Sequence, residues 1–213
     1  MRDRMRELHF SIEGLEGVRE ELSRGRGMVL LTPHFDSFIL GIVCLGMSGL
    51  TVNVMTSDVV ENPLVDDSVR RFFFNKYRSM ELYLRGGKAV HVEKDLSFFY
   101  RALLAGECVV VLADLPTPAP GKNRIWLRFL GRERSFLSGA YRLARRTGSA
   151  VTGFVCRWEG AGNYTVNFHK CLPPDEINET SYQQIYTFFD EAIRRSPERW
   201  WSADLLGAFE DRQ

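Results

Sequence analysis

The chain has 213 residues, a length that suits one domain with a sizeable hydrophobic core. Hydrophobic residues make up 45% and charged residues 26%, values that are typical of a soluble globular protein. The formal net charge is only +1, and no basic run or stretch of interleaved aromatic and basic residues occurs, so the composition argues against a nucleic-acid partner.

Membrane and metal signals are weak in this sequence. The longest apolar stretch, residues 38–54, is interrupted by glycine, serine and asparagine and is too short to span a membrane. The first ten residues are charged and lack the apolar core of a secretory signal. The four cysteines include no close Cys-x-x-Cys pair, so we interpret them as buried free thiols in a reducing compartment and expect no metal site.

Predicted helices and strands alternate along the chain. Residues 1–25 are expected to form a helical lead-in, in which Ser11 could cap a helical segment that Gly25 and Gly27 end. Strands are then expected over residues 28–31, 51–56, 89–92, 108–113, 125–129, 151–157 and 164–169. Helices are expected over residues 37–46, from Pro63 onward, over 95–105, 138–146 and 181–195. This order predicts a single α/β domain over residues 1–213, a sandwich in which helices flank a central, mostly parallel or mixed sheet.

The helix expected after Pro63 carries two kinds of side chain. One set has the spacing of a buried face: Leu64, Val69, Phe72 and Phe73. The other set is basic and is either a solvated face or a cluster beside an anionic ligand: Arg70, Arg71, Lys76 and Arg78.

The turn after the first buried strand carries His34 and Asp36. It lies at the carboxyl end of a strand and beside a helix N-terminus, where open α/β sheets usually place their chemistry. A histidine in a turn is often structural, but Asp36 is close enough to bond one ring nitrogen, fix the tautomer and leave the other nitrogen as a base. Asp36 could equally be the cap of the following helix.

A second candidate position follows the clearest buried strand, Cys108–Ala113, which is apolar on both faces. That strand ends in Asp114. The loop after it, residues 115–124, contains three prolines and a glycine and cannot be a helix or a central strand. A long, rigid loop after a central strand favours a functional role, and Asp114 and His34 could share one edge of the sheet.

The order of these segments resembles the lysophospholipid acyltransferase superfamily, and within it the lipid A late acyltransferases, which transfer lauroyl or myristoyl chains. The resemblance runs from about Met28 to Trp201 and rests on HFDSFILG, ENPLVD, ALLAGECVVVLADLPTPAPGKN, LRFLGRERSFLSGAYRLARRTGSAVTGFVCR and SPERWW, in that order. It implies transfer of an acyl group from a thioester of acyl carrier protein or coenzyme A to a hydroxyl or an amine. It also implies that no metal or organic cofactor is needed.

The resemblance assigns a catalytic histidine and leaves its partner open. Enzymes of this kind use a histidine followed five residues later by an acid, because the acceptor hydroxyl needs a base during attack on the thioester. The histidine carries over as His34, but the position of the acid is Ile39. Asp36 is the carboxylate nearest in sequence and is therefore the candidate partner.

The same resemblance suggests substrate-binding residues. Asp114 matches an acidic residue at the end of the central strand, and Arg78 lies where a basic residue often follows the NPL helix. Ser37 and Phe38, beside the histidine, complete this set of candidates. The phosphate-binding blocks of simple glycerophosphate acyltransferases are not intact here, which disfavours lysophosphatidate as the acceptor.

Two further expectations follow from the resemblance. The N-terminal membrane anchor that is usual in the lipid A branch has no counterpart in this sequence, so we expect a specialised biosynthetic enzyme that is cytoplasmic or peripheral at the inner membrane. Ile39 in place of the acid keeps an alternative open, a non-catalytic homologue that binds acyl carrier protein or lipid. A serine hydrolase is disfavoured because no Gly-x-Ser-x-Gly segment occurs.

Overall fold

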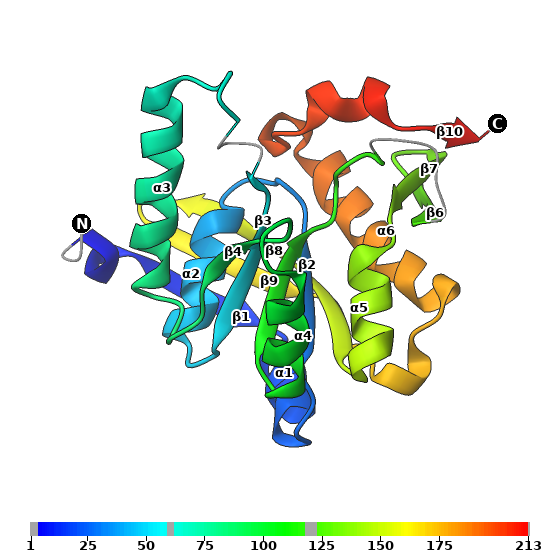
Figure 1. Cartoon of the computed structure of the whole chain (residues 1–213), viewed down its shortest axis with the longest axis horizontal. Coiled ribbons are helices and arrows are strands. Elements are labelled where there is room, and N and C mark those ends of the chain that lie inside the picture. The colour runs from blue at the N-terminus through cyan, green and yellow to red at the C-terminus, as the bar shows by residue number, and fades with distance from the viewer. Residues whose placement is uncertain (1–3, 59–61, 118–122, 213) are drawn as a thin grey trace.

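A seven-stranded sheet forms the centre of the molecule, in the order β1-β9-β8-β2-β5-β3-β4 (Figure 1). The computed structural model describes residues 4–58, 62–117 and 123–212. The strands of this sheet are β1 (His9–Glu13), β2 (Met28–Thr32), β3 (Val52–Thr56), β4 (Ala89–His91), β5 (Cys108–Leu112), β8 (Ala150–Gly160) and β9 (Asn163–Phe168). Neighbouring strands are parallel except for the antiparallel pair β8–β9. The predicted α/β class with a mixed, mostly parallel sheet is confirmed.

Helices cover both faces of this sheet, and the central strand β2 is buried along its whole length. Val29 and Leu31 pack into one apolar cluster with residues of α4, α5 and α6, whereas Met28 and Leu30 pack into the other with residues of α1 and α2. This division follows from the strand period of two, which sends successive side chains to opposite faces. The helices are α1 (Leu15–Ser23), α2 (Phe38–Met47), α3 (Asp67–Glu81), α4 (Leu96–Leu104), α5 (Gly139–Thr147) and α6 (Glu179–Arg195).

A small antiparallel sheet, β10-β7-β6, lies beside α6. Its strands are β6 (Arg124–Phe129), β7 (Arg132–Leu137) and β10 (Asp211–Arg212). Short 3₁₀ helices complete the described chain: η1 (Arg4–Glu7), η3 (Pro174–Glu176), η4 (Pro197–Arg199) and η5 (Ala203–Ala208). The loop predicted between β5 and β6 falls partly outside the described residues, because residues 118–122 are not among them.

The helical lead-in predicted for the N-terminus is wrong for residues 9–13, which form strand β1. Ser11 does not cap a helix; its hydroxyl donates to Thr165 Oγ1 on β9 at 3.1 Å. The following helix, α1, instead begins after Gly14, whose left-handed backbone (φ 84°) favours glycine. A five-residue strand that pairs with a segment about 150 positions later leaves no strong local signal.

The buried face predicted for α3 is also wrong. Leu64, which lies before α3, and Val69 and Phe72 within it are 93%, 41% and 62% exposed. Phe73 is half-buried, and the buried residue of this helix is Met80, near its C-terminal end. The reason is the position of α3 beside β4, a three-residue strand at the edge of the sheet. The N-terminal half of the helix therefore extends past the layer that could cover it.

Several local predictions are confirmed. The Asp95 carboxylate accepts the backbone N–H of Phe98 at 2.9 Å and caps α4. Gly148 ends α5 in a left-handed conformation, and β8 and β9 pair across the predicted turn. Cys44, Cys108 and Cys156 are buried free thiols, whereas Cys171 is only partly buried. Burial raises the pKa of Cys108 to about 12, so this thiol stays protonated.

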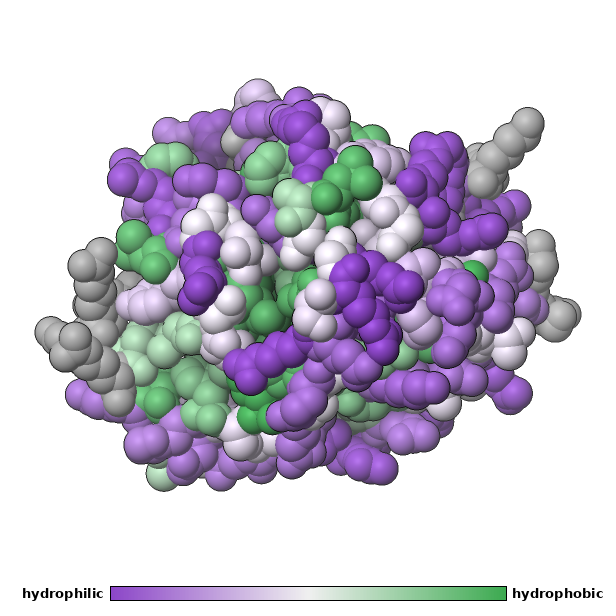
Figure 2. All heavy atoms as spheres, turned by 90° about the horizontal axis from the view of Figure 1, so that it is seen from below, coloured by the Kyte–Doolittle hydropathy of each residue, from purple (hydrophilic) through white to green (hydrophobic). Residues whose placement is uncertain are grey.

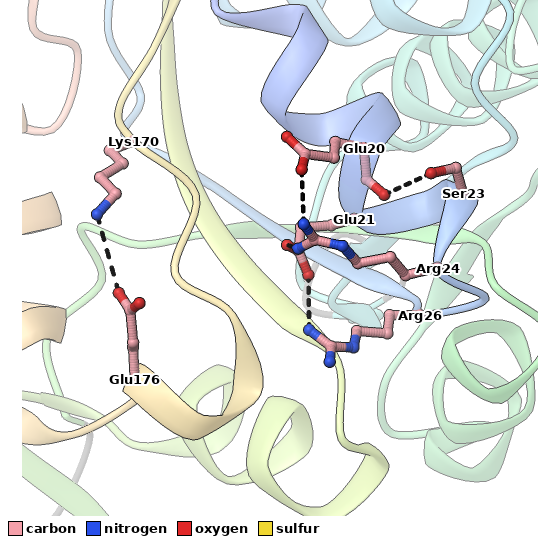
Figure 3. Close-up of polar contacts among 7 residues, drawn as sticks. All are labelled: Glu20, Glu21, Ser23, Arg24, Arg26, Lys170 and Glu176. Carbon is pink, nitrogen blue, oxygen red and sulfur yellow. Dashed lines mark hydrogen bonds and ion pairs between the residues drawn. The ribbon is translucent and has the colours of Figure 1, made fainter.

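A buried carboxylate fixes the corner between α1 and β2 (Figure 3). Glu21 is only 4% exposed, and its two carboxylate oxygens accept hydrogen bonds from the guanidinium groups of Arg24 and Arg26. Pairing on both sides compensates the desolvation of the carboxylate. This network holds the chain where it enters β2.

Figure 2 views the molecule from below. On this face, apolar residues gather around a hollow near the middle, and polar residues surround them. Among the described residues, no helix is both long and apolar enough to cross a membrane.

Candidate active site

His34 and Asp114 meet at the carboxyl edge of the sheet. Strands β2 and β5 are parallel neighbours in which Thr32 pairs with Leu112, so the residues that follow these two strands lie side by side. The Asp114 carboxylate is 2.8 Å from His34 Nδ1 through Oδ1, and it accepts the backbone N–H of His34 through Oδ2 at 2.9 Å. The imidazole is thereby tied to a carboxylate that is 80 residues away in the chain.

The hydrogen bonds around Asp114 indicate which ring nitrogen of His34 carries a proton. Asp114 is 1% exposed, and its Oδ2 also accepts the indole N–H of Trp200 at 2.8 Å. The backbone N–H of His34 and the indole N–H can only donate, and a carboxylate can accept from every one of its neighbours. His34 Nδ1 is therefore assigned as the third donor, which leaves Nε2 as the basic nitrogen.

The side chains that pack around His34 are apolar, but solvent still reaches the imidazole. The His34 side chain is 23% exposed, and its ring packs edge-on against Phe38, with 5.2 Å between the ring centroids. Phe38 in turn packs against Trp201, which is 65% exposed. The imidazole is thus partly accessible to solvent.

Tyr186 supports the end of β5 from α6. Its hydroxyl donates to the backbone carbonyl of Ala113 at 2.8 Å, directly before Asp114. Burial raises the pKa of this phenol well above its usual value, so it stays a neutral donor. The residue directly before Asp114 is thereby held through its backbone, in addition to the contacts of the Asp114 carboxylate.

Asp36 is not the carboxylate that contacts His34, contrary to the sequence-based expectation. Its oxygens accept the guanidinium of Arg199 at 2.7 Å, the backbone N–H of Trp158 at 3.1 Å and the Ser37 hydroxyl at 2.9 Å. Its backbone is left-handed (φ 47°), and this conformation accompanies a carboxylate directed at Arg199 and Trp158. The alternative of a helix cap is wrong too, because Ser37 is the N-cap of α2 and no side-chain capping bond forms there.

The remaining candidates divide into two groups. Ser37 and Phe38 lie in the turn and at the start of α2, beside His34. Arg78 lies in the last turn of α3, where its guanidinium packs over Phe74 at 5.6 Å from the ring centroid. The structure does not bring Arg78 to the His34–Asp114 pair, because the main strand neighbour of α3 is the edge strand β4, three positions from β2 in the sheet.

Two site residues were missed by sequence reasoning, Arg199 and Trp200. Their signal was present in the segment SPERWW, which the resemblance used only as a landmark. No local pattern connects this segment with a turn some 165 residues earlier, so their contacts with Asp36 and Asp114 could not be read from spacing.

Replacing Asp36 by alanine is expected to destabilise the fold by about 1–3 kcal/mol, the usual loss when a charged hydrogen-bonding group is removed from buried partners. Alanine also tolerates the left-handed backbone poorly. Asp36→Asn should cost less, because asparagine accepts this backbone and keeps one oxygen for the Trp158 N–H. The urea midpoints, at unchanged m-value, measure the stability lost in each variant. Equal midpoints for wild type and Asp36→Ala would show that the contacts of the Asp36 carboxylate do not stabilise the fold.

Comparisons with known proteins give the family of the chain. A family model described as bacterial lipid A biosynthesis acyltransferase matches residues 1–202. The chain is also 26% identical to the lipid A biosynthesis lauroyltransferase of Escherichia coli (strain K12) over 190 residues, which are 88% of this chain and 58% of that relative. It thus spans less than two thirds of the length of this curated relative. Because the family model covers nearly the whole sequence, the chain belongs to the bacterial lipid A biosynthesis acyltransferase family.

Proposed function

We propose that this protein transfers an acyl group from an acyl thioester to a hydroxyl or amine acceptor, with His34 as the general base. The single observation that carries the proposal is the 2.8 Å contact between Asp114 Oδ1 and His34 Nδ1 at the carboxyl edge of the sheet. It supports a ring held in one tautomer, with the proton on Nδ1 and Nε2 left as the base. Membership of the family supports the reaction class.

The proposed reaction forms one bond from the acceptor oxygen or nitrogen to the acyl carbon and breaks the carbon–sulfur bond of the donor. As the acceptor attacks the thioester carbonyl, His34 Nε2 takes its proton. The resulting imidazolium returns that proton to the departing thiolate. The Asp114 carboxylate stabilises the imidazolium through its contact with Nδ1, the role of the carboxylate in comparable histidine-based sites.

In this proposal Asp114 takes over the role of the acid that this family places five residues after the histidine. Ile39 occupies that position on α2 and packs against the apolar cluster of that face of the sheet. The replacement does not leave the imidazole without a carboxylate, because Asp114 already contacts it from β5. We propose acyl carrier protein or coenzyme A as the carrier of the donor, which enters as a substrate.

The experiment is mass spectrometry of the purified protein incubated with acyl-carrier-protein and acyl-CoA thioesters. Soluble hydroxyl- and amine-bearing acceptors form one arm, and lipid acceptors in detergent form the other. The expected result is thioester loss that requires an acceptor, together with the acyl mass on that acceptor. The arm that reacts decides between a soluble acceptor and a membrane lipid.

A second candidate function is supported by Ile39 alone: a homologue that binds the acylated carrier or a lipid without turnover. It predicts saturable thioester binding in the same mixtures and no acceptor-dependent loss. Such a result, across both acceptor arms, would contradict the acyltransferase proposal.

A further inference from the structure

The segment Arg199–Trp201, here called the C-terminal strap, lies across the turn Pro33–Ser37, here called the His34 turn. The backbone N–H of Trp201 donates to the carbonyl of His34 at 2.8 Å, and the backbone N–H of Asp36 donates to the carbonyl of Arg199 at 2.8 Å. Phe35 and Trp200 form an antiparallel bridge between these contacts. The strap is thus paired with the turn through the backbone.

The side chains of Arg199 and Trp200 add to this pairing. Arg199 Nη1 donates to Asp36 Oδ2 at 2.7 Å and to the carbonyl of Trp158 at 3.1 Å, which joins the turn to β8. In the middle of the strap, the Trp200 indole reaches inward and is only 6% exposed. Its N–H meets Asp114 Oδ2 at 2.8 Å.

The contact with Trp200 determines how the Asp114 carboxylate is turned. Oδ2 accepts both the indole N–H and the backbone N–H of His34, so Oδ1 is the oxygen directed at the imidazole. Without the indole N–H, Oδ2 keeps one donor, and the buried carboxylate can tilt away from the ring. The orientation of Asp114 and the tautomer of His34 are therefore set together.

We propose that Trp200 is a positioning residue whose indole N–H fixes the Asp114 carboxylate in the orientation that holds His34 with its proton on Nδ1. Its importance for catalysis rests on the proposed function, whereas its effect on the tautomer does not. The strap then acts as the part of the chain that completes the site, because its backbone pairing brings the indole to Asp114.

The test compares wild type with Trp200→Phe, which keeps an aromatic ring and removes the N–H. The matched control is Trp126→Phe on β6, which removes an indole N–H in the small sheet. Two-bond ¹H–¹⁵N spectra of ¹⁵N-histidine-labelled protein report which nitrogen of each ring is protonated, and the four histidines are few enough to assign by substitution. This measurement requires no substrate.

The expected result is a mainly Nδ1-protonated His34 in wild type and in Trp126→Phe, and a clear rise of the Nε2-protonated form in Trp200→Phe. In the transfer assay, kcat of Trp200→Phe should fall about 10- to 100-fold, the range for losing a hydrogen bond to a charged group, with KM nearly unchanged. An unchanged tautomer in folded Trp200→Phe would overturn the proposal, even if the variant were less stable.

A measurement on the wild type covers the case in which Trp200→Phe does not fold. The Trp200 indole proton should be shifted downfield and protected from exchange, whereas that of the exposed Trp201 in the same spectrum should exchange rapidly. Absence of the downfield shift would overturn the proposal. If wild type consumes no thioester, the proposed function fails, and the tautomer spectra still decide the role of Trp200.

Discussion

His34→Ala is expected to lower acyl transfer about 10²–10⁴-fold, the usual contribution of a general base. The acceptor would then have to attack the thioester without losing its proton to the protein. The fold should survive, because the N–H of His34 bonds to Asp114 and its carbonyl bonds to Trp201 through backbone atoms that alanine retains. Acceptor-dependent thioester loss, followed by mass spectrometry, gives the rate.

A matched control for this variant is His9→Ala. His9 lies exposed on β1, the edge strand three positions from β2 in the sheet, and should leave the rate unchanged. Urea midpoints of both variants separate a lost base from a lost fold. Transfer by His34→Ala at the wild-type rate would exclude His34 as the base, whatever its position in the structure.

The strand, turn and helix around His34 could be predicted from the sequence. An apolar run that ends in Thr-Pro and is followed by another apolar run predicts a buried strand, a turn and a helix, and the structure has β2 and α2 there. The same reasoning placed Asp114 at the end of β5. Because carboxyl ends of parallel strands share an edge, the sequence could bring both residues to one side of the sheet.

The pairing of His34 with Asp114 could not be predicted in the same way. Spacing favoured Asp36, two residues from the histidine. The carboxylate that contacts His34 is instead decided by the pairing of β2 with β5 and by the left-handed backbone of Asp36. Both are tertiary properties. The exposure of Phe72 on α3 likewise depends on tertiary structure. Helical spacing predicts which residues share a face, but not whether another layer covers that face.

Asp114→Asn is expected to reduce transfer about as strongly as loss of the base, roughly 10²–10⁴-fold, because it reverses the tautomer of His34. The backbone N–H of His34 and the indole N–H of Trp200 both donate to Oδ2, and neither can accept. The amide oxygen of asparagine must take that place, which turns its NH₂ group toward His34 Nδ1. Nδ1 then accepts, the proton moves to Nε2, and the base is blocked.

Asp114→Asn and Asp114→Ala are expected to differ in both activity and stability. Alanine removes the group that orients the imidazole but forces no tautomer, so folded Asp114→Ala should retain a higher kcat than Asp114→Asn. Asp114→Ala should nevertheless be the less stable protein, because two buried donors lose their acceptor. Transfer rates, urea midpoints and ¹⁵N spectra of His34 measure the three effects separately. An asparagine variant that keeps the Nδ1-protonated ring and the wild-type rate would show that Asp114 does not govern His34.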